Sequence, residues 1–304
     1  MDYILLILGL AGLFAGGEAL VRGAVGIAQR LAMSPLLIGL TVVGFGTSTP
    51  ELLVSVDAAL RGVPDIAIGN VVGSNIGNIL LIVGLSALVW PIRVAGGTLR
   101  RDLAVMLAAA LVLVPLFWTG TLGRAAGLLL VLALMAYLTW AWLAPGEAEA
   151  EAEAKSRPLW QSLIWVGIGL AALMLGARWL VDGAVSIART HGLSEAFIGL
   201  TIVAVGTSLP ELATSMMAAL RRQSAIAIGN IVGSNIFNVL GILGVTALIA
   251  PIPVAGRFLN FDLPVMIGAS LALAGLLLLR PGIGRVMGCA LLLAYSGYVW
   301  AAQG

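Results

Sequence analysis

The feature that most constrains this chain is a duplication with an offset of 160 residues. The stretch 39–84 aligns with 199–244 without a gap, and 29 of the 46 positions are identical. Its centre reads GLTVVGFGTSTPEL in the first copy and GLTIVAVGTSLPEL in the second, followed by AIGNVVGSNIGN and AIGNIVGSNIFN. Each copy places one glutamate, Glu51 or Glu211, directly after a proline in an apolar run. Any fold of this chain must therefore accommodate the same unusual segment twice.

The composition places both copies in a membrane. Of the 304 residues, 61% are apolar and only 10% are charged, and the mean hydropathy is +1.09, whereas soluble domains are about half apolar. A helix of about 20 apolar residues spans a bilayer, and the alternating segments of about 10 residues that mark a β-barrel are not seen. We predict an all-α membrane protein with ten transmembrane helices, near residues 3–21, 35–60, 65–90, 102–118, 123–143, 159–180, 195–220, 225–249, 262–279 and 284–301.

The duplication also defines two halves. Asp102 aligns with Asp262 at the same offset of 160 residues, so the repeat extends beyond its best-matched stretch. We predict a first five-helix repeat at 1–144 and a second at 159–304, joined by a low-complexity acidic connector at 145–158. Because five is odd, the second repeat must cross the membrane in the opposite sense. Such inverted repeats recur in secondary transporters, which bind their substrate at the midplane where the repeats meet.

The basic residues predict the orientation. Cytoplasmic loops of membrane proteins carry an excess of Lys and Arg, and with the N-terminus outside, the cytoplasmic loops hold 11 of the 16 basic residues. We therefore predict a multi-pass protein of the cytoplasmic (inner) membrane with both termini outside and the connector in the cytoplasm. The basic residues are scattered among the loops, so membrane topology explains the pI near 9.0 better than a nucleic-acid partner does, and the lipid bilayer is the expected surrounding.

Hydroxyls surround each glutamate at helical spacing. Thr47 and Ser48 precede Glu51 by four and three residues, so their side chains share its helical face. Pro50 cannot donate a backbone hydrogen bond and its ring clashes with the preceding turn, so we expect the helix to break or kink here and to free carbonyl oxygens. The second copy repeats this arrangement with Thr207, Ser208, Pro210 and Glu211.

The following segment of each copy adds amides and hydroxyls on one helical stripe. The residues recur every four positions: Asn70, Ser74 and Asn78 in the first copy and Asn230, Ser234 and Asn238 in the second. With the two glutamates they form an all-oxygen ligand set, which suits hard cations such as Ca²⁺, Na⁺ or K⁺. Cys289 and His191 are the only residues of their types, so the sequence offers no thiolate cluster and no imidazole pair for softer metals.

The glutamates also have a structural interpretation, in which each would pair with Lys or Arg inside the membrane. No Lys or Arg occurs in the four segments that carry the motifs, namely 39–60, 64–89, 199–220 and 224–249. A bare carboxylate at the bilayer centre costs several kcal/mol, so each glutamate needs a bound cation or a proton. For the neighbouring residues the alternatives stay open, because hydroxyls often bond to the carbonyl four residues earlier and Asn70 and Asn230 could simply join two helices.

At these motifs the chain resembles the calcium/cation antiporter superfamily, specifically its prokaryotic sodium/calcium exchanger branch. The resemblance covers essentially the whole chain, because GTSxPE followed by GSNxxN occurs at matching positions in both halves. It implies ten transmembrane helices in inverted repeats around a central cluster of cation sites. By this resemblance Glu51 and Glu211 coordinate Ca²⁺. The other implied ligands are the backbone carbonyls of Thr47, Thr207, Gly44 and Ala204, the hydroxyls of Ser48, Ser74, Ser208 and Ser234, and the amide of Asn78.

One position departs from the pattern of the family. Asn238 stands where some relatives carry Asp, so the core holds only two negative charges. One Ca²⁺ or two Na⁺ would neutralise them, and a third Na⁺ would add net positive charge. The amide also weakens any case for potassium dependence, which in relatives is tied to an acidic residue at this position.

The sequence thus predicts a transporter and not an enzyme. The leading hypothesis is secondary active exchange of Na⁺ for Ca²⁺ by alternating access, with these ions as the only partners needed besides lipid and with no cofactor or protein partner. Ca²⁺/H⁺ antiport is the alternative, because the carboxylates could carry protons, although proton-coupled relatives have Asn in place of the Ser/Thr pair before the glutamate. A passive cation channel is a more remote alternative. A hydrolase is disfavoured because His191 lies far from both motifs in the sequence.

Overall fold

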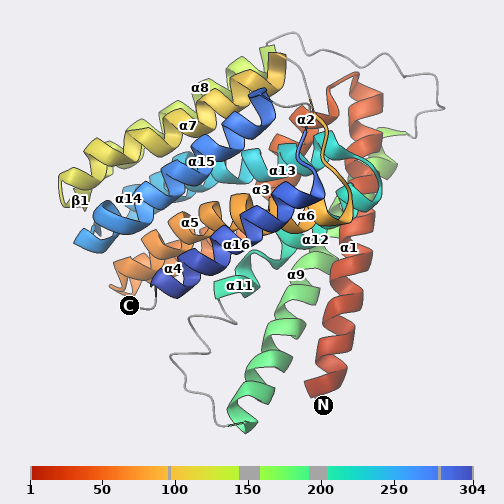
Figure 1. The fold of residues 1–304 in the computed structure, drawn as a ribbon, viewed down its shortest axis with the longest axis horizontal. Helices are drawn as coiled ribbons and strands as arrows, with labels where there is room; N and C mark the ends of the chain where they lie inside the picture. The colour runs from red at the N-terminus through yellow and green to blue at the C-terminus, as the bar shows by residue number, and fades with distance from the viewer. Residues whose placement is uncertain (1, 95–96, 144–157, 192–203, 280–281, 303–304) are drawn as a thin grey trace.

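The computed structural model describes residues 2–94, 97–143, 158–191, 204–279 and 282–302, and these are almost entirely helical (Figure 1). In this part of the chain, eight helices are long and apolar enough to cross a membrane. The chain is therefore a multi-pass membrane protein. The eight spans are α1 (Asp2–Leu31), Pro64–Val89, α7 (Gly97–Trp118), α8 (Arg124–Leu143), α9 (Leu159–Thr190), Ser224–Ile249, Phe258–Leu279 and α16 (Arg285–Ala302).

The predicted span 35–60 is interrupted beside its proline. α2 (Pro35–Ile38), the π-helical turn η1 (Gly39–Val43) and α3 (Gly44–Thr47) lead to a break at Ser48, and α4 (Thr49–Leu60) leaves the break at an angle of 43°. Pro50 lies in the first turn of α4, where its missing N–H would have no intrahelical partner in any case. The predicted kink is confirmed, and the break makes this segment a ninth candidate span.

The second copy builds the same break. α11 (Ala204–Thr207) and α12 (Leu209–Leu220) meet at Ser208. Ser48 and Ser208 adopt nearly the same backbone angles, with φ of −84° and −89° and ψ of 6° in both. This conformation is sparsely populated and common in functional sites. The first part of the predicted span 195–220 lies outside the described residues, so the total of ten spans stays a prediction.

Three further spans contain π-helical turns that the sequence pattern did not predict. η2 (Asn78–Ile82) joins α5 (Pro64–Gly77) to α6 (Val83–Val89), and η4 (Phe237–Leu243) joins α13 (Ser224–Ile236) to α14 (Gly244–Ile249). η5 (Phe258–Asp262) leads into α15 (Leu263–Leu279). A π-turn inserts an extra residue into a helix and is frequent at functional sites. The turns η2 and η4 lie at the predicted ligands Asn78 and Asn238.

Figure 1 shows α1 and α9 side by side at one edge of the molecule, where they cross the inclined bundle that the other long helices form. Two short strands, β1 (Thr121–Leu122) and β2 (Ile252–Pro253), pair antiparallel at the far end of this bundle. The bundle contains a continuous apolar core contributed by α5 to α8 and by α13 to α16. A second, smaller core lies between the bundle and the pair α1 and α9.

Contacts between the two halves are reciprocal. Gly9 of α1 packs against Leu180 of α9, and Gly169 of α9 packs against Leu20 of α1. The members of the second contact are the repeat counterparts of those of the first, at the offset of 160 residues. Reciprocal contacts of this kind characterise a two-fold relation. At this crossing of α1 and α9, the two halves therefore present matching surfaces to each other.

The aligned aspartates Asp102 and Asp262 anchor helices within each half. Asp102 is fully buried and accepts a hydrogen bond of 3.1 Å from the Tyr137 hydroxyl of α8. Asp262 accepts one of 3.0 Å from the Tyr298 hydroxyl of α16. Each carboxylate also pairs with an arginine of its own half. These two carboxylates are thus neutralised within the protein.

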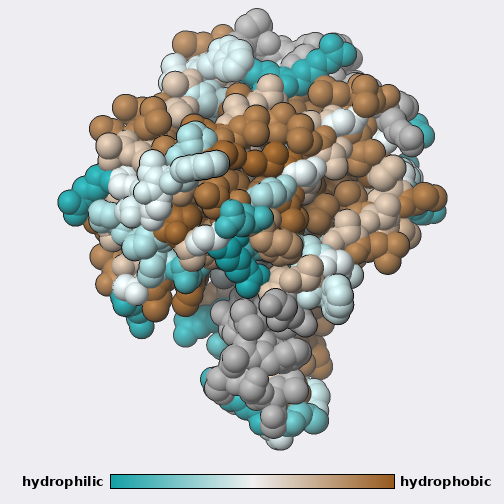
Figure 2. Space-filling model, turned by 60° about the vertical axis from the view of Figure 1, so that its left-hand side comes forward, coloured by the Kyte–Doolittle hydropathy of each residue, from teal (hydrophilic) through white to brown (hydrophobic). Residues whose placement is uncertain are grey.

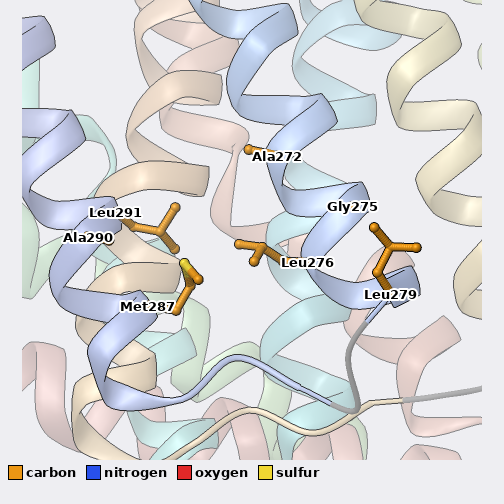
Figure 3. A pocket seen from close by; sticks show the side chains of 7 residues that line it. All are labelled: Ala272, Gly275, Leu276, Leu279, Met287, Ala290 and Leu291. Atoms are coloured by element: carbon orange, nitrogen blue, oxygen red, sulfur yellow. The ribbon is translucent and has the colours of Figure 1, made fainter.

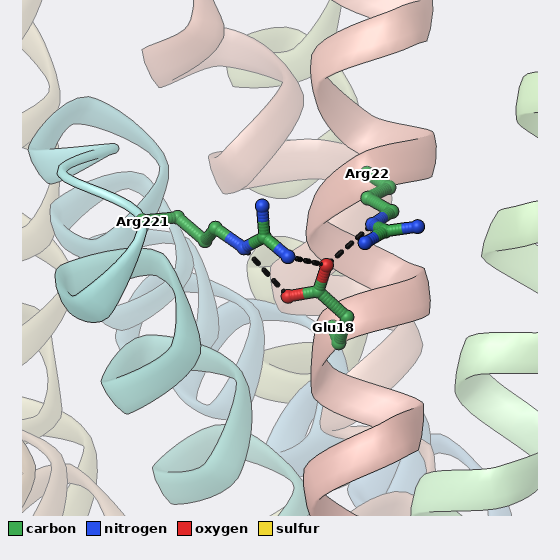
Figure 4. Close-up of polar contacts among 3 residues, drawn as sticks. All are labelled: Glu18, Arg22 and Arg221. Atoms are coloured by element: carbon green, nitrogen blue, oxygen red, sulfur yellow. Dashed lines mark hydrogen bonds and ion pairs between the residues drawn. The ribbon is translucent and has the colours of Figure 1, made fainter.

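A charged cluster links α1 to the end of α12 (Figure 4). Glu18 of α1 lies between Arg22, one turn further along α1, and Arg221, the C-terminal cap of α12. The Nε of Arg221 donates a hydrogen bond of 2.7 Å to Glu18 Oε2. The contact is not reproduced in the other half, because Arg178 and Arg61 occupy the counterpart positions of Glu18 and Arg221. Two guanidinium groups cannot pair, and each binds an aspartate on its own helix instead.

The outer surface is apolar, as a lipid-facing surface requires. Hydrophobic side chains cover much of the face in Figure 2, and Trp300 and Trp118 are more than three-quarters exposed. An open groove of about 370 Å³ lies between α15 and α16 (Figure 3). It is lined only by apolar or small residues, namely Ala272, Gly275, Leu276, Leu279, Met287, Ala290 and Leu291. The groove therefore offers no side-chain ligand to a cation.

The crossing of α1 and α9 depends on glycines and generates a stability prediction. A Cβ on Gly169 would lie 2.5 Å from the backbone nitrogen of Leu20, whereas a Cβ on Gly167, two residues earlier in α9, would meet no atom within 4 Å. Overpacking a tight contact costs about 1–3 kcal/mol, and small residues let membrane helices approach closely. We expect Gly169→Ala to lower the melting temperature of the detergent-purified protein, measured by thermal unfolding, and Gly167→Ala to leave it unchanged or slightly higher. Equal melting temperatures for the two variants would contradict this packing.

Candidate cation-binding site

Both predicted glutamates lie in the interior of the bundle. The exposed fraction of Glu51 and of Glu211 is 1%. The breaks at Ser48 and Ser208 place each glutamate in the first turn of a new helix, α4 or α12. The N-terminus of a helix carries a partial positive charge, which offsets part of the free energy that burial of each carboxylate requires. The local breaks therefore make the burial of two acids feasible.

Each carboxylate accepts a hydrogen bond from the opposite half. The Ser48 hydroxyl donates to Glu211 Oε1 at 2.9 Å, and the Ser208 hydroxyl donates to Glu51 Oε1 at 3.3 Å. The second oxygen of each carboxylate, Oε2, is buried and has no hydrogen-bond partner. Each glutamate therefore has one oxygen satisfied by the protein and one oxygen available to a ligand.

In the part of the chain that the structure describes, no basic side chain balances these two acids. Among the described residues, the ion pairs involve Glu18 and four aspartates, and neither Glu51 nor Glu211 has a Lys, Arg or His nitrogen within 4.0 Å. The described part of the chain also contains no group of three or more His, Cys, Asp and Glu residues placed to hold a metal. A cation at this site would therefore be bound by two carboxylates and by neutral oxygens.

The predicted amides supply such neutral oxygens. Asn78 and Asn238 are each 1% exposed, and their Nδ2 groups donate hydrogen bonds of 3.0 Å to Asn235 Oδ1 and Asn75 Oδ1. The Oδ1 atoms of Asn78 and Asn238 are buried and have no partner. Four unpaired oxygens, one from each predicted glutamate and amide, thus belong to the predicted ligand set. Ca²⁺ takes six to eight oxygen ligands, so hydroxyls, carbonyls or water would complete its shell.

The predicted hydroxyls connect the two halves around the glutamates. Ser208 Oγ lies 3.3 Å from Ser74 Oγ, and the Ser234 hydroxyl donates to the Gly44 carbonyl at 3.3 Å. The Gly44 carbonyl also accepts the Ser48 N–H at 3.1 Å. This predicted carbonyl ligand is therefore already engaged by protein groups. Its counterpart Ala204 is the first described residue of α11.

The predicted threonines bond to asparagines of the opposite half. Thr47 Oγ1 lies 3.1 Å from Asn230 Oδ1 and from the carbonyl of Val43, four residues earlier. Thr207 Oγ1 lies 3.5 Å from Asn70 Oδ1. The Thr47 side chain thus makes the bond to the preceding turn that hydroxyls in helices often make. Its backbone carbonyl is the atom that the family resemblance assigns to the cation.

Asn70 and Asn230 join neighbouring helices, as the alternative interpretation of the sequence expected. The Asn70 amide donates to the Glu51 carbonyl at 3.0 Å and to Ser55 Oγ at 2.9 Å. The Asn230 amide makes the same two contacts in the second half, with the carbonyl of Glu211 and with the Ser215 hydroxyl. Each amide therefore holds the helix that carries a glutamate against the helix that follows it.

Two buried residues of this region were missed from the sequence. Asn75 and Asn235 are 3% and 1% exposed and accept the hydrogen bonds of Asn238 and Asn78. The signal that could have identified them is their place in the duplicated GSN motif, because a buried amide that appears in both copies needs partners. Asn75 and Asn235 do not belong to the stripe of residues at every fourth position from which the ligands were predicted.

Comparison with known proteins identifies the family of this chain. The sequence profile of the sodium/calcium exchanger protein family matches residues 1–143 and 161–303. The candidate antiporter CaxA of Alkalimonas amylolytica is 44% identical over 310 residues, which cover 97% of this chain and 96% of CaxA. The sodium/calcium exchanger MaX1 of Methanosarcina acetivorans is 32% identical over 347 residues, which cover 98% of this chain and 97% of MaX1.

A solved structure of a sodium-calcium exchanger has a similar fold. The sodium-calcium exchanger NCX_Mj, in crystals soaked without Na⁺ and Ca²⁺, superimposes with a TM-score of 0.88 at 33% sequence identity, covering 99% of this chain and 98% of that one. The family profile spans both halves, including both GTSxPE motifs. This chain belongs to the sodium/calcium exchanger family.

Proposed function

We propose that this protein exchanges Na⁺ for Ca²⁺ across the cytoplasmic membrane, at one central all-oxygen site that both halves build. The observation that carries the proposal is the burial of Glu51 and Glu211, each with one unpaired oxygen and with no basic partner among the described residues. An uncompensated carboxylate inside a membrane protein marks an ion pathway by default. Two such groups that share one hydrogen-bonded cluster suit a divalent cation or two monovalent ones.

The charge of the cluster supports alternate occupation by the two ions. One Ca²⁺ or two Na⁺ neutralise the two carboxylates, so the ions compete for the same charges. Asn78 and Asn238 contribute oxygens without contributing charge. A third Na⁺ would leave a net positive charge in a low-dielectric interior, which is costly. Charge neutrality of the two carboxylates alone would correspond to two Na⁺ for each Ca²⁺.

Alternating access follows from the proposed topology of ten helices in two inverted five-helix repeats. The reciprocal contacts of the two halves support this topology, because a two-fold relation combined with an odd number of spans reverses one repeat across the membrane. The distribution of Arg and Lys supports termini outside and a connector in the cytoplasm. The inner membrane protein YrbG of Escherichia coli, 38% identical over 98% of this chain, supports the location.

The hydroxyl groups that contact the two carboxylates favour Na⁺ over the proton as the counter-ion. Ser48 and Ser208 contact the two glutamates directly, and Ser74 Oγ lies 3.3 Å from the Ser208 hydroxyl. Neutral oxygens of this kind can coordinate Na⁺, whereas a proton needs only the carboxylate oxygen itself. Ca²⁺/H⁺ antiport stays the second candidate, since the unpaired Oε2 atoms of Glu51 and Glu211 could each be protonated.

Ca²⁺ binding should stabilise the protein through Glu51. A ligand at 100 times its dissociation constant stabilises the folded state by about 2.7 kcal/mol, so Ca²⁺ should raise the melting temperature of the purified protein in Na⁺-free buffer. Glu51→Gln should abolish this increase because it removes one of only two negative charges. The matched control is Asp57→Asn on the same helix α4, whose side chain is 58% exposed and paired with Arg61. A Ca²⁺-dependent increase that persists in Glu51→Gln and disappears in Asp57→Asn would reverse the assignment.

Transport should be driven by a sodium gradient. Proteoliposomes loaded with Na⁺ and diluted into Na⁺-free buffer should accumulate ⁴⁵Ca²⁺, and an ionophore that dissipates the Na⁺ gradient should stop the uptake. Glu211→Gln should reduce the uptake to the level of empty liposomes, and Asp57→Asn should retain it. Uptake that follows an imposed pH gradient and ignores Na⁺ would establish Ca²⁺/H⁺ antiport. Ca²⁺ flux that needs no counter-ion gradient would establish a channel.

A further inference from the structure

Asn75 and Asn235 bond to each other across the two halves and also bond to the predicted ligands Asn238 and Asn78. The Asn75 amide donates to the backbone carbonyl of Asn235 at 3.2 Å, and the Asn235 amide donates to the backbone carbonyl of Asn75 at 3.4 Å. The two residues are repeat counterparts at the offset of 160 residues, so the two bonds are equivalent under the two-fold relation of the halves. A backbone carbonyl can only accept a hydrogen bond. The Nδ2 end of each side chain is therefore committed to the opposite half.

This commitment determines where the other end of each side chain points. With Nδ2 bound to a carbonyl, Oδ1 of Asn75 faces Asn238 and accepts its Nδ2–H at 3.0 Å. Oδ1 of Asn235 faces Asn78 in the same way, also at 3.0 Å. Each chain of bonds thus runs in one direction, from an amide of the ligand set through Asn75 or Asn235 to a backbone carbonyl.

The direction of these bonds orients the ligand amides. An asparagine can present either its oxygen or its NH₂ group, and only the oxygen can bind a cation. If the Asn238 amide turned over, its oxygen would face Asn75 Oδ1 at a hydrogen-bonding distance without a hydrogen between them. A buried acceptor left unsatisfied is costly. Asn238 Oδ1 is therefore the end left unpaired, and the same holds for Asn78 Oδ1.

We propose that Asn75 and Asn235 are positioning residues for the cation site. They hold the amides of Asn238 and Asn78 with the oxygen directed away from the bond and available to the ion. They also require a hydrogen-bond donor at both positions, which an ionised carboxylate cannot provide, and so keep the core at two negative charges. This inference rests on the proposed function, because it assigns Asn78 and Asn238 to the ion.

The test is a double-mutant cycle on Ca²⁺ affinity. The full-length protein in detergent is titrated with ⁴⁵Ca²⁺ in Na⁺-free buffer as wild type, Asn75→Ala, Asn238→Ala and the double variant. Loss of a residue that orients a metal ligand costs about 10- to 100-fold in affinity, so Asn75→Ala should weaken binding at least about tenfold. In the Asn238→Ala background the same change should weaken it less than about threefold, because the amide that Asn75 orients is gone.

The control is Asn70→Ala, which removes another interhelical amide that does not contact Asn238. Its effect on affinity should be the same in both backgrounds. Equal effects of Asn75→Ala with and without Asn238 would overturn the positioning role and leave only a packing role, which the melting temperature of the ion-free protein measures separately. If Asn75→Ala does not fold, the mirror cycle of Asn235→Ala and Asn78→Ala decides the question in the same way.

The outcomes separate this inference from the proposed function. A wild-type protein that binds no ⁴⁵Ca²⁺ would refute the proposed function itself. A wild-type protein that binds ⁴⁵Ca²⁺ and loses it in Glu51→Gln, but shows additive effects at residues 75 and 238, would keep the exchanger and remove the positioning role alone.

Discussion

The site depends on the burial of two carboxylates that have no basic partner within the described ranges of the chain. A charged side chain at the centre of a bilayer costs several kcal/mol, and the chain offers Glu51 and Glu211 only partial compensation. Each lies in the first turn of a helix, where the dipole is favourable, and each accepts one hydroxyl hydrogen bond. Elsewhere in the described residues, buried acids such as Asp102 are matched by arginine. The glutamates lack such a match among the described residues, and the proposed function assigns the remaining compensation to a bound cation, with a proton as the alternative.

The duplication explains why the site lies between the halves. Ser48 serves the carboxylate of Glu211, and Ser208 serves that of Glu51, so neither repeat completes its own site. The asparagines follow the same rule, because every ligand amide donates to a residue of the other repeat. Crossed contacts of this kind require both copies to carry the same motif at the same place. The near identity of the two motifs is thus a structural requirement of the two-fold interface as well as a chemical one.

The sequence predicted the acids and the break but not the pairing across the halves. Pro50 after two glycines and the absence of Lys and Arg were sufficient to place Glu51 in a broken, buried helix. The partner of Ser48 lies 163 residues away, and helical periodicity carries no information about such contacts. The π-turns at Asn78 and Asn238 were not predicted either. A π-turn inserts one residue without changing the apolar composition of the span, so hydropathy does not reveal it. The role of Asn75 depends on the direction of a side-chain amide, which only a three-dimensional arrangement of donors and acceptors can specify.

The crossed hydrogen bonds couple the state of the ion site to the arrangement of the halves. A displacement of α3 and α4 relative to α12 would separate Ser48 from Glu211 and, because the contacts are reciprocal, Ser208 from Glu51 at the same time. Both carboxylates would then lose a donor together, and their demand for a cation would rise. An ion that binds both carboxylates favours one arrangement over another only through such a difference in contacts. In the proposed function, the interdependence of the two glutamates is the physical link by which a bound ion would bias the conformation of the bundle.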